Sequence, residues 1–195
     1  GHLASEPLSL TKLLKRREVL FFLIACLMMQ ASHGAYYAFY SIYLEAQGYT
    51  QTAVGALWAF GVAAEVVVFL YMHRLLERFG ARLVILVSLA LAVLRWLLVG
   101  YFVDLVLVQV AAQTLHAASF GSFHAAAIHQ VHRYFPGATQ GRGQAVYNSI
   151  SFGIGGAFGS LVSGLLWTSA GASATFTVAA AFAALGWVAA ALGKR

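Results

Sequence analysis

Hydrophobic residues occupy six long stretches of the chain, separated by short segments that contain charged residues, glycine or proline. An α-helix needs about 20 apolar residues to cross the hydrocarbon layer of a membrane, which is about 30 Å thick. The breaks delimit six expected helices, over residues 19–44, 51–73, 82–101, 103–131, 143–168 and 172–192. The pattern therefore predicts an all-α membrane protein with six transmembrane helices.

Basic residues lie at alternate connections between these helices. Eleven of the twelve precede the first helix, follow the second or fourth, or end the chain: Lys12, Lys15, Arg16, Arg17, Arg74, Arg78, Arg82, Arg133, Arg142, Lys194 and Arg195. The other three connections contain none. By the positive-inside rule, both termini are expected in the cytoplasm.

Composition excludes a soluble domain. Hydrophobic residues make up 61% of the chain and charged residues only 9%, with a mean hydropathy of +0.79. Residues 1–18 have no signal-peptide core, and their LSLTKLLKRRE stretch predicts a linker at the cytoplasmic membrane surface. Gly1 and His2 resemble remnants of a cloning tag, so we expect a fragment of a longer protein.

The six helices form two triplets of matching character. The first and fourth helices carry polar or aromatic stripes, namely Gln30, His33, Tyr37 and Ser41, and Gln109, Gln113, His116 and Phe120. The second and fifth carry small residues at every fourth position, which permit close packing, and the third and sixth are uniformly apolar. This order predicts a 3+3 inverted repeat, as found in each half of many secondary transporters.

The segment HRLLERFGAR contains Glu77, Arg78, Gly80 and Arg82 at a spacing that resembles the loop signature of the major facilitator superfamily, whereas His73 replaces the first glycine of that signature. The stretches GAYYAFYSIYLEAQGY, AVLRWLLVGY and HRYFPGATQGRGQAVYNSISFGIGGAFGS resemble the C-terminal half of the phenylpropionate permease branch, which is akin to lactose permease and nucleoside/proton symporters. The resemblance covers nearly the whole chain. It implies helices seven to twelve of a twelve-helix carrier, whose N-terminal half supplies the other wall of the pathway.

Glu65, Arg95 and His116 lie within expected helices, where inserting a charge costs roughly 2.5–3.5 kcal/mol and indicates a function. Glu65 and His116 lie at similar depth, which would let them meet across the bundle. The resemblance to lactose permease implies an acid, an arginine and a histidine on these three helices. The carboxylate that lactose permease uses for proton coupling, one turn after the histidine, is replaced here by Ser119.

Two interpretations remain open for each of the charged residues. Glu65 either exchanges a proton during transport or binds a neighbouring helix or an arginine of the absent half. Arg95 either extends to the outer membrane interface, as long basic side chains do, or acts as a fixed cation for an anionic substrate or a carboxylate. Proton coupling is thus expected at Glu65, at a histidine or in the absent half.

Four histidines lie in the segment HAASFGSFHAAAIHQVH, but a regular helix with 100° per residue distributes them over different faces. His116 belongs to the polar stripe, His124 is expected between helices, and His129 and His132 are expected at the cytoplasmic end. The segment lacks the repeated spacing and acidic companions of a metal site, and it lacks the pattern of a membrane serine protease. We therefore expect no enzyme activity, no metal and no cofactor.

These observations predict the C-terminal half of a proton-coupled secondary transporter for a small organic solute. The expected lining residues are Gln30, His33, Tyr37, Gln113, His116 and Phe120, with Glu65 as the proton site and Arg95 as an anion or carboxylate partner. The resemblance alone implies a small aromatic carboxylate as the first candidate substrate and a sugar or nucleoside as the second, carried across a bacterial inner membrane. A membrane receptor or scaffold, or a haem or metal enzyme, is the alternative of a different class; no nucleic-acid partner is expected.

Overall fold

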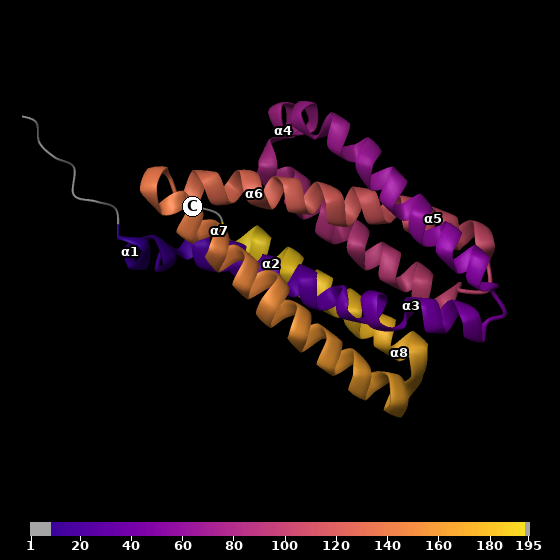
Figure 1. Ribbon diagram of the computed structural model, residues 1–195. Helices are drawn as coiled ribbons and strands as arrows, with labels where there is room; N and C mark the ends of the chain where they lie inside the picture. The colour runs from indigo at the N-terminus through magenta and orange to yellow at the C-terminus, as the bar shows by residue number, and fades with distance from the viewer. Residues whose placement is uncertain (1–8, 194–195) are drawn as a thin grey trace, which may run out of the picture.

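The computed structural model describes residues 9–193, so the expectations for Gly1, His2, Lys194 and Arg195 concern positions outside the described part. Every element in that part is helical, which confirms the all-α class (Figure 1). The elements are α1 (Leu10–Leu14), α2 (Arg17–Ser32), α3 (Gly34–Ala46), α4 (Gln51–Tyr101), α5 (Val106–His116), the π-helix η1 (Ala117–Gly121), α6 (Ser122–Tyr134), the 3-10 helix η2 (Gly137–Thr139), α7 (Gln140–Asn148), the π-helix η3 (Ser149–Gly155) and α8 (Gly156–Leu192).

The helix α4 is a hairpin of two arms. Gly80 interrupts it with φ 74° and ψ 152°, a conformation that glycine adopts without steric cost. The far end of the second arm lies beside the end of α3, because the Tyr43 hydroxyl donates to the Gly100 carbonyl (3.1 Å). Just beyond both elements, the Tyr49 hydroxyl donates to the Val103 carbonyl (2.8 Å). Figure 1 shows α4 turning back at the upper left of the view.

The helix α8 is interrupted in the same way at Gly171, with φ 83° and ψ 177°. Its first arm meets α2 and α3 so closely that a Cβ atom on Gly159 would overlap the backbone of Ala31. A Cβ atom on Gly186, in the second arm, would lie 3.1 Å from the Met28 Cβ atom of α2. Both arms therefore pack alongside the N-terminal helices, and small residues allow the close approach, as in membrane bundles.

Some of the predicted boundaries were wrong. The helix predicted over 51–73 continues to the Gly80 turn, because no residue before it breaks the helix and an i,i+4 pair between His73 and Glu77 (3.1 Å) supports this part. The helix predicted over 103–131 begins at Val106, because Val103 lies in the turn that accepts the Tyr49 hydrogen bond. The helix predicted over 19–44 is divided at His33 into α2 and α3.

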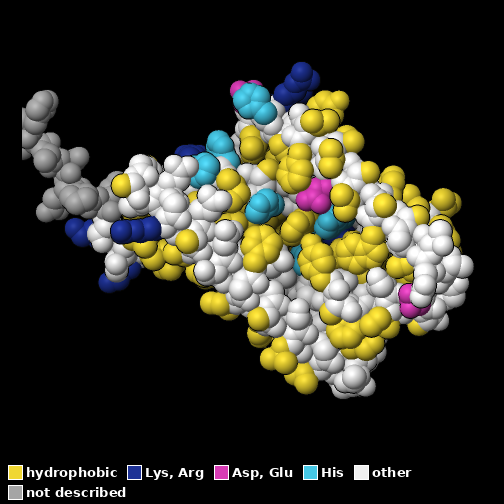
Figure 2. Space-filling view, viewed as in Figure 1, with side chains coloured by type: hydrophobic (Ala, Val, Ile, Leu, Met, Phe, Trp, Pro, Cys, Tyr) yellow, Lys and Arg dark blue, Asp and Glu magenta, His cyan; other side chains and the backbone are white. Residues whose placement is uncertain are grey.

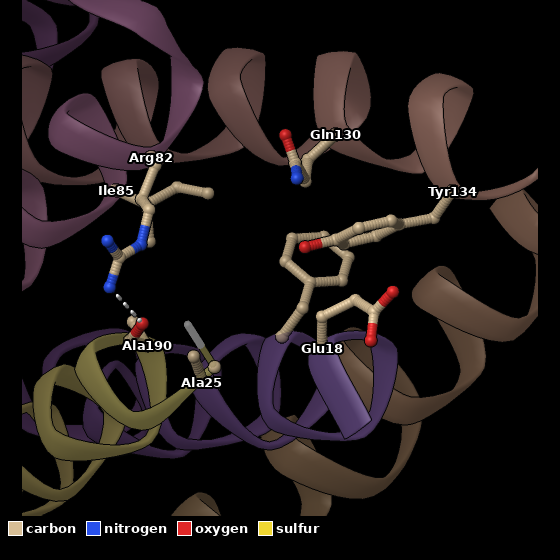
Figure 3. A pocket seen from close by; sticks show the side chains of 9 residues that line it. Glu18, Ala25, Arg82, Ile85, Gln130, Tyr134 and Ala190 are labelled. Carbon is tan, nitrogen blue, oxygen red and sulfur yellow. Dashed lines mark hydrogen bonds between the residues drawn. The ribbon is translucent and has the colours of Figure 1, made fainter. Parts of the chain in front are cut away.

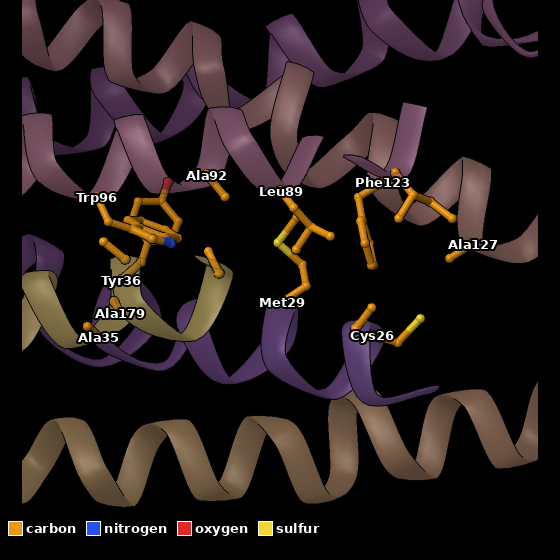
Figure 4. Packing of buried hydrophobic residues seen from close by; sticks show 14 of the residues in the cluster. Cys26, Met29, Ala35, Tyr36, Leu89, Ala92, Trp96, Phe123, Ala127 and Ala179 are labelled. Atoms are coloured by element: carbon orange, nitrogen blue, oxygen red, sulfur yellow. The ribbon is translucent and has the colours of Figure 1, made fainter. Parts of the chain in front are cut away.

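The core lies between α2, the second arm of α4, α6 and the second arm of α8. Figure 4 shows Met29 and Cys26 facing Leu89 and Phe123 across the bundle, and all four side chains are buried. By length and composition, the helical stretches long and apolar enough to cross a membrane in residues 9–193 are Arg17–Ala46, Gln51–Tyr101 and Gly137–Leu192. The stretch from Val106 to Tyr134 is richer in polar residues and carries much of the site described below.

One end of the bundle collects basic side chains. Figure 1 shows α1, the end of α6, the start of α7 and the C-terminus at the left of the view. Figure 2 shows that Lys and Arg side chains gather at this end and along the upper edge, whereas the middle of the same face is largely hydrophobic. In that middle region, acidic and histidine side chains lie next to each other (Figure 2).

Candidate functional site

The site begins at the break between α2 and α3, where two polar side chains bind the same backbone carbonyl. The Ser32 hydroxyl donates to the Met29 carbonyl (2.6 Å), and Nδ1 of His33 donates to it as well (2.8 Å). Such local bonds compete with the regular helix, which explains the interruption at His33. They also hold the imidazole inside the bundle, where His33 is fully buried.

Arg95, on the second arm of α4, meets this imidazole. Its Nη1 donates to Nε2 of His33 at 3.4 Å, so His33 is neutral, with its proton on Nδ1. The guanidinium lies 4.2 Å from the ring centres of both Tyr36 and Trp96, in a cation–π arrangement. Trp96 is fixed in turn, because its Nε1 donates to the Ser32 hydroxyl (3.1 Å).

Arg95 is fully buried, with 0% of its surface exposed. The interpretation that it extends to the outer interface is therefore wrong, because its aromatic neighbours hold it inside the bundle. Its Nε and Nη2 atoms are buried without a hydrogen-bond partner among the described residues. A buried guanidinium that lacks a carboxylate is costly, and its expected role as an anion or carboxylate partner stays a prediction.

Glu65 and His116 form a second pair of ionisable side chains, which is an ion pair only when the histidine is protonated. Glu65 lies fourteen residues from each end of the first arm of α4, and its Oε2 is 3.7 Å from Nε2 of His116. This distance suits an ion pair but exceeds a hydrogen bond. The Glu65 side chain is 19% exposed, and the buried Nδ1 of His116 has no partner in the described part of the chain. The Glu65 carboxylate is thus partly accessible, and the pair is incompletely bonded.

The fourth predicted helix corresponds to α5, η1 and α6, and its histidines do not lie where a regular α-helix would place them. The rings of His116 and Phe120 are stacked at 5.3 Å with an interplanar angle of 7°, and those of Phe120 and His124 at 6.4 Å and 10°. The prediction that His116 and His124 lie on different faces was wrong. The π-helix η1, at Ala117–Gly121, has more residues per turn, so side chains four positions apart realign.

His124 is held at the other end of this stack. Its Nδ1 lies 2.9 Å from the Tyr147 hydroxyl of α7, and its ring meets the Phe152 ring edge-on at 5.8 Å. His129 and His132 lie further along α6, close to its end at Tyr134. His116, Phe120 and His124 therefore form one ladder of rings from the charged pair toward the end of the bundle that carries the basic residues.

Two glutamines of α5, Gln109 and Gln113, connect this helix to α3 and to neighbouring backbone carbonyls. Gln113 accepts from the Tyr36 hydroxyl (3.1 Å) and donates to the Leu57 carbonyl (2.9 Å), while Gln109 accepts from the Tyr40 hydroxyl (3.1 Å) and donates to the Phe102 carbonyl (2.9 Å). Both amides are fully buried, with both ends bonded. The structure therefore gives Gln113 a bracing geometry, and its expected contact with substrate stays a prediction.

The other expected lining residues are divided between two places. Tyr37 is 50% exposed, and its ring lies 6.1 Å from His33 and 6.4 Å from Phe120. Gln30 instead packs against η3 and α8, where a Cβ atom on Gly155 would lie 3.3 Å from its Cβ atom. The structure thus brings Tyr37 close to the cluster formed by His33, Arg95, Glu65 and His116. It places Gln30 away from this cluster, beside η3 and α8.

The loop-signature residues shape the turn between the arms of α4. Gly80 supplies the positive φ angle, and Nη2 of Arg82 donates to the Ala190 and Ala191 carbonyls at 3.2 and 3.0 Å. Glu77 pairs with His73, the residue that stands in place of the signature glycine, and Arg78 lies over the Phe79 ring at 5.3 Å. These residues fix the turn and bind the end of α8, far along the chain from the charged cluster.

Gly121 is a contributor to the site that the sequence did not reveal. A Cβ atom on this residue of η1 would lie 3.0 Å from Cγ of Glu65. The glycine thus leaves space for the Glu65 side chain to reach His116. The contact between Gly121 and Glu65 depends on the π-helix, and the sequence pattern does not predict a π-helix.

This arrangement defines the class of the protein: a helical bundle with stretches long and apolar enough to cross a membrane, in which an arginine and two histidines are buried and a half-buried glutamate lies next to one of the histidines. Charged groups in such positions mark pathways for solutes or protons. In residues 9–193, no three His, Cys, Asp or Glu side chains are grouped as metal ligands.

Comparison with known proteins gives the particular family. Residues 3–178 match the family described as the MFS_1 like family, and the chain belongs to this family of the major facilitator superfamily. It is 39% identical over 136 residues to a protein of Escherichia coli (strain K12) named as a probable 3-phenylpropionic acid transporter, covering 68% of this chain and 34% of that protein. The chain thus spans about a third of the length of this relative, which is a transporter and not an enzyme.

A solved structure shows the same fold. The crystal structure of a mutant of the nucleoside transporter NupG matches with a TM-score of 0.72 and 20% identity, over 97% of this chain and 53% of that one. The expected resemblance to the major facilitator superfamily is confirmed, as is the expectation that the chain is not an enzyme.

Proposed function

We propose that the chain is the C-terminal half of a twelve-helix, proton-coupled secondary transporter in a bacterial inner membrane. The arms of α4 and α8, divided at Gly80 and Gly171, together with α2–α3 and Val106–Tyr134, supply six crossings in a 3+3 inverted repeat. The basic end of the bundle faces the cytoplasm in this arrangement, with both chain ends on that side. Residues 1–18 form the linker from the N-terminal half.

The N-terminal half covers the face on which Glu65, Tyr37 and Phe152 are accessible. Tyr37 and Phe152 are 50% and 40% exposed, and Figure 2 shows hydrophobic side chains surrounding acidic and histidine groups on this side. An accessible carboxylate within such a surface suits the wall of a pathway that a second helical domain closes.

The proposed substrate class rests on Arg95, because two nitrogens of its guanidinium have no hydrogen-bond partner among the described residues. Its two unpartnered nitrogens match the two oxygens of a carboxylate, and the planar guanidinium binds such a group through parallel hydrogen bonds. The rings of Tyr37 and Phe120 lie 6.1 and 4.9 Å from the ring of His33, the partner of Arg95, and supply apolar faces for an aromatic ring. A small aromatic carboxylate, such as phenylpropionate, combines these two features.

The alternative substrate, a sugar or a nucleoside, needs several free hydrogen-bonding side chains. The amides of Gln109 and Gln113 are already bonded at both ends within the bundle. A hydroxyl-rich substrate would find few free polar groups around the cluster. The arrangement therefore favours the aromatic carboxylate, and the transporter relatives favour a carrier over a receptor or scaffold.

Proton coupling is assigned to Glu65 together with His116. The carboxylate lies within ion-pair distance of the imidazole and near Arg95, so its protonation changes the charge balance next to the proposed substrate anion. A proton on Glu65 would offset the negative charge that the substrate brings into the apolar interior. Symport then follows from electrostatics, because the anion and the proton enter together more easily than either enters alone.

Reconstitution of the full-length protein tests this proposal. Proteoliposomes loaded with unlabelled 3-phenylpropionate are diluted into labelled 3-phenylpropionate, and counterflow is compared with the same assay for a sugar and a nucleoside. We expect counterflow with 3-phenylpropionate but not with the sugar or the nucleoside. We also expect 3-phenylpropionate to accumulate inside when the outside is made more acidic than the inside. Counterflow of a sugar or nucleoside without the carboxylate would overturn the substrate class, and carboxylate accumulation independent of the pH gradient would overturn the coupling.

A further inference from the structure

His124, in the first turn of α6, lies apart from the ionisable residues to which the proposed function assigns a role. It follows His116 by eight residues, about 12 Å along the helix axis, in the direction of the basic end of the bundle. Its ring stacks on Phe120 at 6.4 Å and meets the ring of Phe152 in η3 edge-on at 5.8 Å. Phe152 is 40% exposed, so this group of rings opens at the surface that the N-terminal half is proposed to cover.

The hydrogen bond between His124 and Tyr147 fixes the position of the imidazole proton. Tyr147 is buried, and its hydroxyl lies 2.9 Å from Nδ1 of His124, the acceptor within its reach in residues 9–193. A buried phenol hydroxyl donates to the acceptor that it meets, so Nδ1 carries no proton. The proton of the neutral ring is therefore on Nε2, and this atom is a hydrogen-bond donor.

The Nε2 atom of His124 is free to bind a ligand. It makes no hydrogen bond or ion pair within residues 9–193. It is also not one of the buried atoms that lack a partner in that part of the chain, whereas Nδ1 of His116 is. The donor of His124 therefore reaches the surface of the bundle, between the rings of Phe120 and Phe152.

Tyr147 is held from the opposite side, which keeps its hydroxyl on His124. Its ring stacks on Phe22 of α2 at 6.5 Å, with an interplanar angle of 19°. Phe22 lines a pocket of about 50 Å³ at the basic end of the bundle, where Figure 3 shows Arg82 donating to the Ala190 carbonyl. This pocket is too small for an aromatic solute, so the approach to His124 lies on the side of Phe152.

We propose that His124, Phe120 and Phe152 form a second substrate site, here called the inner site, on the cytoplasmic side of Arg95. Its ligand is the aromatic carboxylate of the proposed function, on which this inference rests for both the substrate class and the orientation. Nε2 of His124 donates to a carboxylate oxygen, and the two phenylalanine rings flank the aromatic part.

The inner site suits release of the substrate rather than its capture. Phe120 is shared with the site at Arg95, because its ring also stacks on His116 at 5.3 Å. A solute that leaves Arg95 toward the cytoplasm therefore keeps one aromatic neighbour and meets His124 as the next donor. A neutral imidazole offers one N–H donor and no charge, so it binds a carboxylate less tightly than a guanidinium does.

Transport measured separately at the two faces of the membrane tests the inner site. Right-side-out and inside-out membrane vesicles containing the full-length protein give the KM for 3-phenylpropionate at the outer and cytoplasmic faces. His124→Phe keeps a ring but removes the donor, so the KM at the cytoplasmic face is expected to rise about tenfold, with the KM at the outer face unchanged. His124→Gln retains an N–H donor and should keep a KM near that of the unaltered protein. His129→Phe, at an exposed position of α6, is the matched control.

A second variant leaves the bond between His124 and Tyr147 intact. Phe152→Leu removes a flanking ring and is expected to raise the KM at the cytoplasmic face severalfold. Phe158→Leu, which replaces another exposed ring of the same helical stretch, is its control and should leave both KM values unchanged.

The two faces separate failure of the inner site from failure of the proposed function. With transport intact, an unchanged cytoplasmic KM in His124→Phe would overturn the inner site alone, as would equal changes at both faces. Equal effects of His124→Phe and His124→Gln, or of Phe152→Leu and Phe158→Leu, would overturn it as well. Absence of 3-phenylpropionate transport by the unaltered protein would overturn the proposed function, and the inner site with it.

Discussion

The Arg95 guanidinium lies against the neutral imidazole of His33, with Nη1 3.4 Å from Nε2, and its other two nitrogens remain unbonded. A neutral histidine accepts a hydrogen bond from the arginine but supplies no compensating charge. The contact therefore fixes the orientation of Arg95 without neutralising its charge. The predictions below follow from this arrangement and from the neighbouring pair of Glu65 and His116.

Removal of the carboxyl charge at Glu65 is expected to separate exchange from accumulation. In Glu65→Gln the side chain no longer takes up and releases a proton, so substrate accumulation under a pH gradient falls to the equilibrium level. Counterflow, which needs no net proton movement, continues. Transport of labelled carboxylate into proteoliposomes measures both, with Glu45→Gln, at the exposed end of α3, as the control. Intact gradient-driven accumulation in Glu65→Gln would move the coupling site elsewhere.

A methyl group at Gly121 is expected to disturb the same pair. The added Cβ atom would lie 3.0 Å from Cγ of Glu65, and overpacking of this kind costs about 1–3 kcal/mol. Gly121→Ala should therefore reduce gradient-driven accumulation, because Glu65 is displaced from His116. Gly153→Ala is the matched control, since its Cβ atom would meet nothing within 4 Å in the other π-helix. Equal behaviour of the two variants would contradict the spatial role of Gly121.

The bracing geometry of Gln113 predicts an effect on stability. Gln113→Leu removes the bonds to Tyr36 and to the Leu57 carbonyl, each worth about 0.6 kcal/mol in a membrane protein, and so costs about 1 kcal/mol. Thermal unfolding should show a lower melting temperature, with little change in substrate affinity. A large loss of affinity at unchanged stability would instead support the direct substrate contact expected from the sequence.

The ring ladder predicts a role for Phe120 in binding the aromatic part of the substrate. Phe120→Ala removes the ring that stacks on both His116 and His124, and an aromatic pair contributes about 0.5–1.5 kcal/mol beyond burial. We expect an affinity for 3-phenylpropionate at least severalfold lower and an unchanged affinity for a short aliphatic carboxylate. Equal losses for both ligands would indicate that Phe120 acts on the carboxylate site or on folding.

Much of this architecture could be predicted from residue patterns. Apolar length gave the helical class, and the breaks near Gly80 and Gly171 lie in the expected connections, because glycine and charged residues end membrane helices in a recognisable way. The similar depth of Glu65 and His116 also followed from counting residues along regular helices, and the structure brings them to 3.7 Å.

Other features depend on tertiary contacts that residue spacing does not encode. The fixed angle of a regular helix separated His116 from His124, whereas the π-helix at Ala117–Gly121 realigns them. The burial of Arg95 depends on Tyr36 and Trp96 from different helices, and neither partner is identifiable from the arginine's own surroundings in the chain. Gln113 is buried, and its bonds to Tyr36 and the Leu57 carbonyl could not be predicted without the positions of these neighbours.

The central claim is that Arg95 binds the substrate carboxylate. The most direct measurement is the affinity of the full-length protein for 3-phenylpropionate and for its neutral amide, determined by calorimetry for the unaltered protein, Arg95→Gln and the control Arg142→Gln. Hydrogen bonds to a charged group contribute about 1.5–3 kcal/mol, so the unaltered protein and the control should bind the carboxylate at least about tenfold more tightly than the amide. Arg95→Gln should lose that preference, and a preference for the carboxylate that survives in Arg95→Gln would contradict the account.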